Sequence, residues 1–256
     1  MDWEASRKEM SGRGKVRKFA DAVIAICLLV IAVFSGIKLH HLISEYRNNQ
    51  QAYEVISEDT TEDDDSLRVD FDELRKINPD VVGWIRYKCA NIDYPIVHGR
   101  DNSKYLYTRF DGAYSDFGTL FVDTAAQAPF EQFNTIIYGH HMQDGSMFGS
   151  LKKLKDPEFC RKHPKMELAA PEDNYDLEIW AFLNQPSDSR IFTNNVSFEE
   201  DREAYLDWIR NKAVYTTDAD ISTDDRLVIL STCAYEYSGA RYIVVCKMML
   251  SDKGQH

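Results

Sequence analysis

The chain has 256 residues, of which 44% are hydrophobic, including 14 Tyr and 13 Phe, and this is ample for a sizeable globular core. The net charge of −12 argues against nucleic acid as a partner, because nucleic-acid binding requires basic surfaces. The five cysteines are odd in number and widely spaced, with no C-x-x-C pair, so neither a disulfide framework nor a zinc site is predicted.

The N-terminal segment predicts a membrane anchor. Residues 1–21 carry six basic residues against four acidic ones, whereas residues 22–37 carry no charge, and Phe19 and Leu39 extend the apolar stretch. About 20 apolar residues span a bilayer, and basic flanks stay on the cytoplasmic side. We therefore expect a single-pass protein of the cell membrane with a cytoplasmic N-terminus and an extracellular body. The alternatives are a cleaved signal peptide, for which no clear A-x-A site follows, and a buried helix of a soluble domain.

A polar segment with a dense run of acidic residues comes next. His40 to Gln51 is expected to continue the helix, and the acidic side chains between Ser57 and Asp72 repel one another and stay solvated. We interpret this segment as a stalk that holds the domain off the membrane, rather than as an acidic binding tail. The predicted organisation is a cytoplasmic basic tail (1–18), a transmembrane anchor (19–39), a polar and acidic stalk (40–69) and a catalytic domain (70–251).

From residue 81 onward, short apolar runs alternate with turns. Eight runs of strand length with few long helices predict a mostly β fold with added helices, closed into an eight-stranded barrel. The predicted strands are Val82–Tyr87, Tyr94–Val97, Thr119–Val122, Asn134–Tyr138, Met166–Ala169, Leu177–Leu183, Arg226–Thr232 and Arg241–Met249.

Four helices are predicted around these strands. Asp70 and Glu73 are placed to cap a short helix that ends at Asn78-Pro79. Short helices are expected over Gly145–Leu154 and Pro157–Lys162. A longer one follows the capping-box pattern Ser197-x-x-Glu200, with an apolar face made of Tyr205, Trp208 and Ile209.

The last two predicted strands carry the first candidates for chemistry. Cys233 ends one strand and Arg241 starts the next, and Ser238-Gly239 marks the turn between them. A nearby cation favours the thiolate, so Cys233 is a candidate nucleophile and Arg241 a candidate donor to an oxyanion. Acyl transfer through a thioester is the reaction that these groups best support. The competing interpretations are a buried core cysteine and an arginine paired with a carboxylate.

The candidate base comes from an earlier strand. His140 and His141 follow that strand and Gly139, which we expect to let the backbone turn and expose an imidazole at the barrel rim, where Cys233 also ends its strand. Alternation alone does not decide which histidine faces inward. A metal site is not predicted from this pair, because adjacent residues on a strand point to opposite faces.

In this order, the motifs resemble those of the sortases, and more specifically class B of that family. The core of the resemblance is Leu230-Ser231-Thr232-Cys233 with Arg241 on the following strand and Tyr138-Gly139-His140 earlier in the chain. The likeness covers roughly Phe71 to Met249, and the helix around Ser197–Lys212 also fits class B. The other matching motifs are Asn78 to Trp84, Asp93 to Pro95, Asp101-Asn102 with Tyr105-Leu106, Gly139 to Met142, and Gly145 to Phe148.

The resemblance implies a sortase-type eight-stranded barrel that recognises the C-terminal sorting signal of exported surface proteins. It implies cleavage after the Thr of that signal through a thioacyl enzyme, and transfer to an amine, usually of a peptidoglycan precursor in a Gram-positive-type cell wall. Carried over by motif, Cys233 is the nucleophile, His140 the acid and base, and Arg241 the carbonyl and oxyanion clamp. Further matches are Asn102, Leu106, Tyr138 and Ser231 in the substrate groove, and the Ala234 N–H at the oxyanion site.

Some points stay open at this level. The loop from Ser187 to Asn195 is expected to help grip the sorting motif, and Glu236 either orients His140 or is a solvated turn carboxylate, the interpretation that we favour. No cofactor or metal is predicted. The alternatives to a transpeptidase are a thiol peptidase that uses water as the acceptor and a non-catalytic surface-anchored binding module whose cysteine is merely buried.

Overall fold

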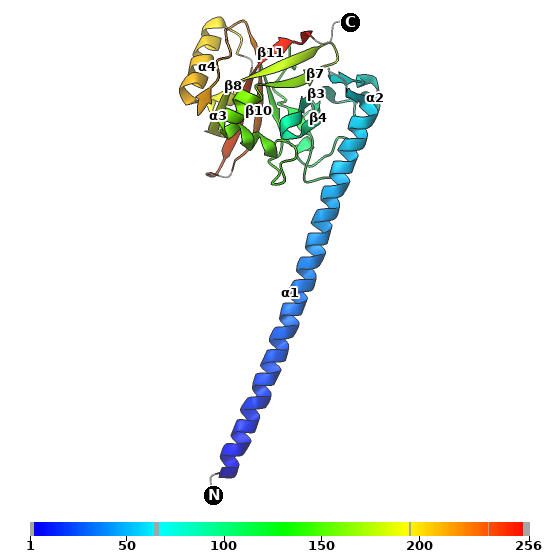
Figure 1. The fold of residues 1–256 in the computed structure, drawn as a ribbon, viewed down its shortest axis with the longest axis vertical. Helices are drawn as coiled ribbons and strands as arrows, with labels where there is room; N and C mark the ends of the chain where they lie inside the picture. Colours follow the sequence, from blue (N-terminus) through cyan, green and yellow to red (C-terminus); the bar gives the residue numbers. More distant parts are fainter. Residues whose placement is uncertain (1–2, 64–66, 195, 235, 253–256) are drawn as a thin grey trace. The chain divides into compact units, whose positions relative to one another are not determined.

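The structure is a computed structural model that describes residues 3–63, 67–194, 196–234 and 236–252 (Figure 1). It contains two compact units, Met1–Gln51 and Ala52–His256. The first unit consists of the N-terminal part of helix α1 (Trp3–Thr60). Within the described part of the chain, one helical segment, Val23–Ser57, is long and apolar enough to cross a membrane. Its apolar side chains are exposed, for example Leu29 at 66%.

The second unit is built on a mixed β-barrel. The strands follow the order β11-β10-β6-β5-β4-β3-β7-β8, and pairing of β11 with β8 closes the barrel. The predicted eight-stranded barrel is therefore confirmed. Its strands are β3 (Val81–Tyr87), β4 (Ile92–Val97), β5 (Leu120–Val122), β6 (Asn134–Tyr138), β7 (Lys165–Ala169), β8 (Asn174–Pro186), β10 (Arg226–Cys233) and β11 (Ala240–Leu250).

Strand β8 is the largest departure from the predicted strand boundaries. The apolar run predicts only Leu177–Leu183, whereas β8 extends at both ends to Asn174–Pro186. Its polar ends stay in the sheet because β8 pairs with β7 along its first part and with β11 along nearly its whole length. A short strand that the sequence did not predict, β9 (Tyr215–Thr216), also pairs with β8.

The short helices largely follow the predictions. In α2 (Phe71–Ile77), the Asp70 carboxylate accepts the backbone N–H groups of Asp72 and Glu73, as the capping pattern predicted. Helix α3 (Pro157–Lys162) is confirmed, but the helix predicted over Gly145–Leu154 is instead the 3₁₀ helix η3 (Gly149–Lys155). The other 3₁₀ helices are η1 (Lys88–Ala90), η2 (Lys104–Leu106) and η4 (Arg190–Phe192).

Helix α4 (Glu199–Lys212) covers one side of the barrel (Figure 1). The predicted capping box is wrong by one residue, because Phe198 rather than Ser197 occupies the N-cap position. Three acidic residues in its first turn, Glu199 to Asp201, suit the positive end of the helix dipole instead. The buried face also shifts, since Leu206 is buried and Trp208 is only partly so.

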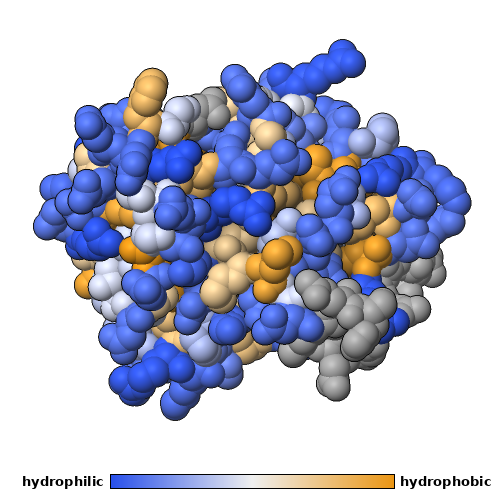
Figure 2. Space-filling view, turned by 90° about the horizontal axis from the view of Figure 1, so that it is seen from above, coloured by the Kyte–Doolittle hydropathy of each residue, from blue (hydrophilic) through white to orange (hydrophobic). Residues whose placement is uncertain are grey.

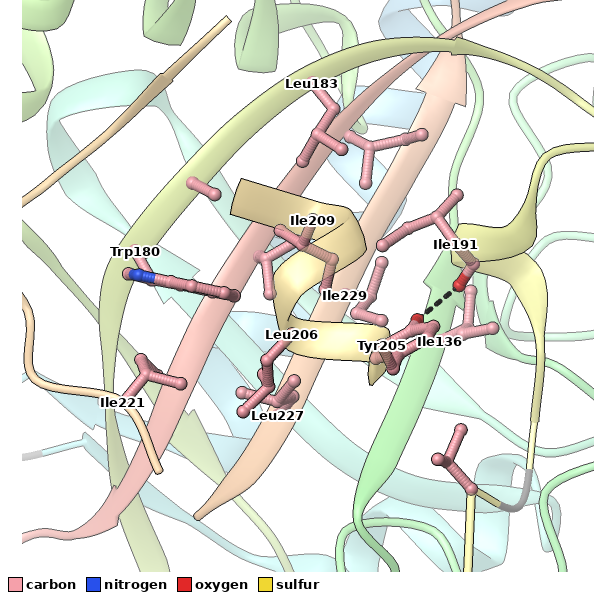
Figure 3. Packing of buried hydrophobic residues seen from close by; sticks show 14 of the residues in the cluster. Ile136, Trp180, Leu183, Ile191, Tyr205, Leu206, Ile209, Ile221, Leu227 and Ile229 are labelled. Carbon is pink, nitrogen blue, oxygen red and sulfur yellow. Dashed lines mark hydrogen bonds between the residues drawn. The ribbon is translucent and has the colours of Figure 1, made fainter. Parts of the chain in front are cut away.

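Figure 3 shows how α4 is held on the barrel. Tyr205, Leu206 and Ile209 of the helix lie among side chains of the strands and of η4, including Trp180, Leu227 and Ile191. The Tyr205 hydroxyl donates to the Ile191 carbonyl at 2.5 Å. Since η4 belongs to the loop that precedes α4, this bond ties the loop to the helix and to the core.

The segment before α2 differs from the expected solvated stalk. From Ala52 onward, the end of α1 belongs to the globular unit, and residues after it form the hairpin of β1 (Thr61–Asp63) and β2 (Leu67–Val69). Residues 64–66 lie outside the described part. Tyr53 is buried, and its hydroxyl donates to the Gly118 carbonyl at 2.8 Å. The hydrophobic side chains Ile56 and Leu67 are buried as well. The acidic composition of this segment therefore led to the wrong prediction that all of it is solvated.

The surface carries no broad apolar area on the face that Figure 2 shows. Hydrophilic residues predominate there, and hydrophobic residues occur in small separate patches (Figure 2). Such scattered patches are normal for a folded domain in water.

Tyr53→Phe tests the structural role of the segment before α2. Loss of the hydroxyl leaves the buried Gly118 carbonyl without this donor, so we expect the free energy of unfolding to fall by about 1–2 kcal/mol. The measurement is urea unfolding of the full chain in detergent, followed by tryptophan fluorescence. Tyr237→Phe is the matched control, because Tyr237 is 44% exposed, and it should change stability by less than about 0.5 kcal/mol. Equal effects of the two variants would contradict a structural role for Tyr53.

Candidate active site

Three barrel strands bring the candidate catalytic residues to one rim. Strands β6 and β10 are parallel, with Tyr138 opposite Ser231, and the Gly139 N–H continues the pairing by donating to the Ser231 carbonyl at 3.1 Å. Strands β10 and β11 are antiparallel, with Cys233 directly opposite Arg241. Because β6 and β10 run in the same direction, the residues that follow them emerge at the same edge of the barrel.

This rim holds a pocket of about 260 Å³. His140, Cys233 and Arg241 all line it, so residues from three separate strand ends meet in one cavity. Cys233 is a half-buried free thiol. The remaining lining residues are Asn102, Leu106, Phe121, Tyr138, Gly139, Ser187, Phe192, Ser231 and Thr232.

Four of the five residues predicted to bind substrate line this pocket. Asn102, Leu106, Tyr138 and Ser231 line the pocket, whereas Ala234 does not. Phe121 and Thr232 line it as well, and sequence reasoning missed both. Both lie within predicted strands. They were missed because alternation alone does not tell which side chains near the end of a strand face the rim.

His140 is held by a carbonyl of the pocket wall. Its Nε2 lies 2.7 Å from the carbonyl oxygen of Leu106, at the end of η2. A carbonyl only accepts hydrogen bonds, so Nε2 carries the hydrogen, and Nδ1 is left as the nitrogen that can accept one.

His141 lies on another side of Cys233 and does not line the pocket. Its Nδ1 donates to the backbone carbonyl of Cys233 at 2.6 Å, and its ring lies 5.8 Å from that of Tyr242. Burial lowers the pKa of His141 below its usual value, with the Cys233 carbonyl opposing the shift. The two histidines, which alternation could not separate, thus have different partners.

Gly139 is needed for space and not for an unusual backbone turn. Gly112, Gly118, Gly145 and Gly239 have positive φ, whereas Gly139 does not, so its backbone conformation is open to other residues. A Cβ at position 139 would lie 2.4 Å from Leu120 Cδ2 and 2.7 Å from Phe148 Cδ2. Glycine therefore lets the chain pass close to these two side chains just before His140.

The two expected oxyanion donors both contact the carbonyl of Ala240. The Ala234 N–H donates to it at 2.8 Å, and Arg241 Nη1 donates to it at 3.0 Å. The Ala234 N–H is thus engaged in the β10–β11 ladder, which corrects the expectation that it faces the oxyanion site. Arg241 is different, because its guanidinium carries five N–H donors and lines the pocket.

Glu236 does not contact His140. Its carboxylate accepts from Lys155 Nζ at 2.7 Å and from the Tyr242 hydroxyl. These two hydrogen bonds outweigh burial and lower the pKa of Glu236, so the carboxylate stays charged. Glu236 is exposed in the turn after β10, as the favoured interpretation predicted. Its pairing with Lys155 was not predicted, because Lys155 lies in η3, far away in the chain.

Aromatic side chains form one wall of the pocket. The Tyr138 ring stacks with that of Phe192 at 6.2 Å and tilts against Phe121 at 5.4 Å. The Tyr138 hydroxyl donates to Asp123 Oδ2 at 2.8 Å, and burial together with this carboxylate raises the pKa of Tyr138 above its usual range. Ser187 and Phe192 come from the loop predicted to grip the sorting motif, of which Asn195 lies outside the described residues.

Comparison with known proteins decides the family. The family model described as a sortase domain matches residues 88–249, which is more than half of the chain. The chain belongs to the sortase family. It is 32% identical over 243 residues to sortase B of Listeria monocytogenes, covering 92% of this chain and 99% of the relative. With sortase B of Staphylococcus aureus the identity is 28%, over 89% and 96% of the two chains.

Solved structures agree on class B. A Staphylococcus aureus sortase B–substrate complex superposes with a TM-score of 0.72 at 26% identity, and sortase B from B. anthracis in complex with AAEK1 with a TM-score of 0.72 at 33% identity. Both cover 82% of this chain and 100% of the solved chain. The resemblance to class B sortases found in the sequence is confirmed, and the protein is an enzyme of the sortase transpeptidase type.

The lowered pKa of His141 gives a pH prediction. An unfolded histidine binds its proton near pH 6.5, whereas the folded protein binds it only at lower pH. The contribution of His141 to stability is therefore fully present above pH 6.5, and it is lost as the pH falls from 6.5 through the lower pKa of the folded state. NMR titration of the histidine rings, with His141 assigned by its loss in His141→Gln, should give a midpoint below 6.5. A midpoint at or above 6.5 would contradict the burial argument.

Proposed function

We propose that this sortase cleaves a C-terminal sorting signal after its Thr and attaches the resulting protein to an amine of a peptidoglycan precursor. The observation that supports the proposal best is the meeting of Cys233, His140 and Arg241 in one pocket, which supplies a nucleophile, a proton carrier and a fixed cation. These are the groups that acyl transfer through a thioester requires.

In the first half-reaction, His140 Nδ1 takes the thiol proton of Cys233 as Sγ attacks the carbonyl carbon of the signal's Thr. The guanidinium of Arg241 holds the Ala240 carbonyl through Nη1 and donates hydrogen bonds from its other N–H groups to the oxyanion that forms. The C–N bond then breaks, and His140 Nδ1 gives a proton to the departing amine. The products are a thioacyl enzyme on Cys233 and the released C-terminal fragment.

In the second half-reaction, the acceptor amine attacks the thioester carbonyl. Its lone pair forms the new C–N bond, the C–S bond breaks, and the electron pair leaves on Cys233 Sγ. His140 Nδ1 accepts a proton from the attacking nitrogen and passes it to Cys233 Sγ, which restores the thiol for the next cycle.

The pocket walls suit an extended peptide that contains a proline. The stacked rings of Tyr138 and Phe192 offer a flat apolar surface, and Leu106 adds apolar contact nearby. Asn102 Oδ1 accepts the Thr124 N–H at 2.9 Å, which leaves the amide NH₂ as a donor for a peptide carbonyl. The solved relative from Staphylococcus aureus is described as a sortase B–substrate complex, which supports a peptide site in this family.

We further propose that α1 anchors the enzyme in the cell membrane as a single pass. The basic residues of positions 1–21 precede the apolar stretch, which favours a cytoplasmic N-terminus and an extracellular catalytic unit. This location brings the enzyme to both exported surface proteins and wall precursors.

The test uses the full chain in detergent and a panel of sorting-motif peptides that contain Pro and Thr, with mass spectrometry as the readout. We expect a thioacyl adduct on Cys233 that resolves onto an added amine. Cys233→Ala should abolish the adduct and reduce cleavage by at least about a thousandfold. The matched control is Cys89→Ala, a half-buried cysteine outside the pocket, which should form the adduct normally.

Variants of the other two residues should affect different steps. His140→Ala should reduce turnover by about 10²–10⁴-fold and Arg241→Ala by about 10²–10³-fold. An acid product that persists at high amine concentration would instead identify a thiol peptidase. Peptide cleavage by Cys233→Ala, or an adduct on another residue, would contradict the proposal.

A further inference from the structure

Two tyrosines form an exposed aromatic pair next to His140. Tyr107 is 52% exposed and Tyr114 is 72% exposed, although both are large aromatic side chains. Their rings are nearly parallel, with 7° between the planes and 6.3 Å between the centroids. Neither ring lines the pocket that holds Cys233.

The position of the pair relative to His140 is fixed by the backbone. Leu106 lines the pocket, and its carbonyl holds His140 Nε2. Tyr107 is the next residue, and its ring centroid lies 6.1 Å from that of His140. The aromatic pair therefore begins where the pocket wall ends, on the side of the imidazole.

The segment that carries the pair is held by its own backbone hydrogen bonds. Thr108 and Tyr114 form an antiparallel bridge. The Arg109 N–H donates to the Ala113 carbonyl at 2.8 Å, and the Ser115 N–H donates to the Tyr107 carbonyl at 3.1 Å. The two rings are thus presented by a small hairpin, so little ordering is left to occur when a ligand binds.

The charge around the pair is negative. Residues 107–116 carry one cation, Arg109, against two carboxylates, Asp111 and Asp116. Arg109 and Asp111 neutralise each other through two hydrogen bonds, of 2.9 and 2.6 Å. The exposed Asp116 remains, and it accepts the Tyr114 hydroxyl at 2.8 Å, so a carboxylate stands at the end of the aromatic pair.

We propose that the Tyr107–Tyr114 pair binds the ammonium group of the acceptor substrate and delivers it to His140, an inference that rests on the proposed transpeptidase function. The faces of aromatic rings attract cations, and the nearby carboxylate adds to the attraction. A primary alkylamine has a pKa near that of lysine, about 10.4, so it arrives as a cation. The acceptor also has to reach His140 while the pocket is filled by the acyl group, and the exposed pair offers that approach.

In the transfer step, the ammonium loses one proton to His140 Nδ1 and becomes an amine nucleophile. Its lone pair forms the C–N bond while the C–S bond to Cys233 breaks, and the electron pair leaves on sulfur. The new amide nitrogen loses a second proton, so one of the two released protons returns to Cys233 as the thiol and the other goes to solvent.

The kinetic test separates the two half-reactions in the full chain. The thioacyl enzyme is formed with a sorting peptide, and its decay is then followed against the concentration of pentylamine. Tyr107→Leu should raise the KM for pentylamine by about 3- to 30-fold, whereas Tyr107→Phe, which keeps the ring face, should stay within about 2-fold of wild type. The rate of acylation by the peptide should change by less than about 2-fold in both variants, because the pair lies outside the pocket.

Two controls identify the cause. Hydroxylamine is largely uncharged at neutral pH, so its KM should be the same in Tyr107→Leu as in wild type. Phe198→Leu changes an aromatic residue that is 74% exposed at the start of α4, and it should alter neither half-reaction. A raised KM for the sorting peptide, or equal effects on pentylamine and hydroxylamine, would overturn the proposal and would assign the pair to the peptide or to structure.

A binding measurement tests the cation site of the Tyr107–Tyr114 pair independently of turnover. Tetramethylammonium has no N–H group and cannot react, so its titration should shift the NMR signals of the Tyr107 and Tyr114 rings in the wild-type protein. In Tyr107→Leu, the same titration should leave the signals of the Tyr114 ring unchanged. Shifts without any thioacyl enzyme would support the cation site and refute the proposed function. A thioacyl enzyme without such shifts would leave the proposed function intact and refute the cation site.

Discussion

The parallel pairing of β6 with β10 is the constraint on which the site depends. It sets Tyr138 opposite Ser231 and carries the ladder one step further, to the bond from the Gly139 N–H to the Ser231 carbonyl. His140 directly follows Gly139 after β6. Cys233 lies two residues after Ser231 on β10. A shift by one residue would turn every side chain of a strand to its other face, so the barrel core and the site share one register. Arg241 then follows from the antiparallel partner β11.

Hydrogen bonds to the backbone around it also support the end of the cysteine strand. The His141 ring holds the Cys233 carbonyl, and Glu236 in the turn beyond it is paired with Lys155 and Tyr242. On another side, the Ser187 N–H donates to the Gly239 carbonyl at 3.0 Å, which ties the turn to the segment after β8. These bonds leave the pocket side of Cys233 to substrate while they fix the backbone that carries the thiol. Rigid support of this kind is what a nucleophile needs to keep its geometry.

Sequence reasoning reached the strands because each core strand is a run of apolar, often β-branched residues bounded by turn residues. It reached the juxtaposition of Cys233 and Arg241 because a short turn joins adjacent strands. It missed the full length of β8, since polar ends are kept in the sheet by two neighbouring strands and not by their own composition. It also missed the burial of Tyr53 among acidic neighbours, and the use of the Ala234 N–H in the ladder, because both depend on partners distant in the chain or on exact pairing.

A crystal structure of the Cys233→Ala protein with a sorting peptide bound would show directly whether Cys233, His140 and Arg241 act together on the Thr carbonyl. We expect an extended peptide along Tyr138 and Phe192, with the carbonyl of its Thr facing residue 233 and within hydrogen-bond reach of Arg241. We also expect His140 to keep its bond to the Leu106 carbonyl, so that Nδ1 faces the reacting carbonyl. A peptide bound away from this pocket, or one whose Thr carbonyl points away from residue 233, would contradict this expectation.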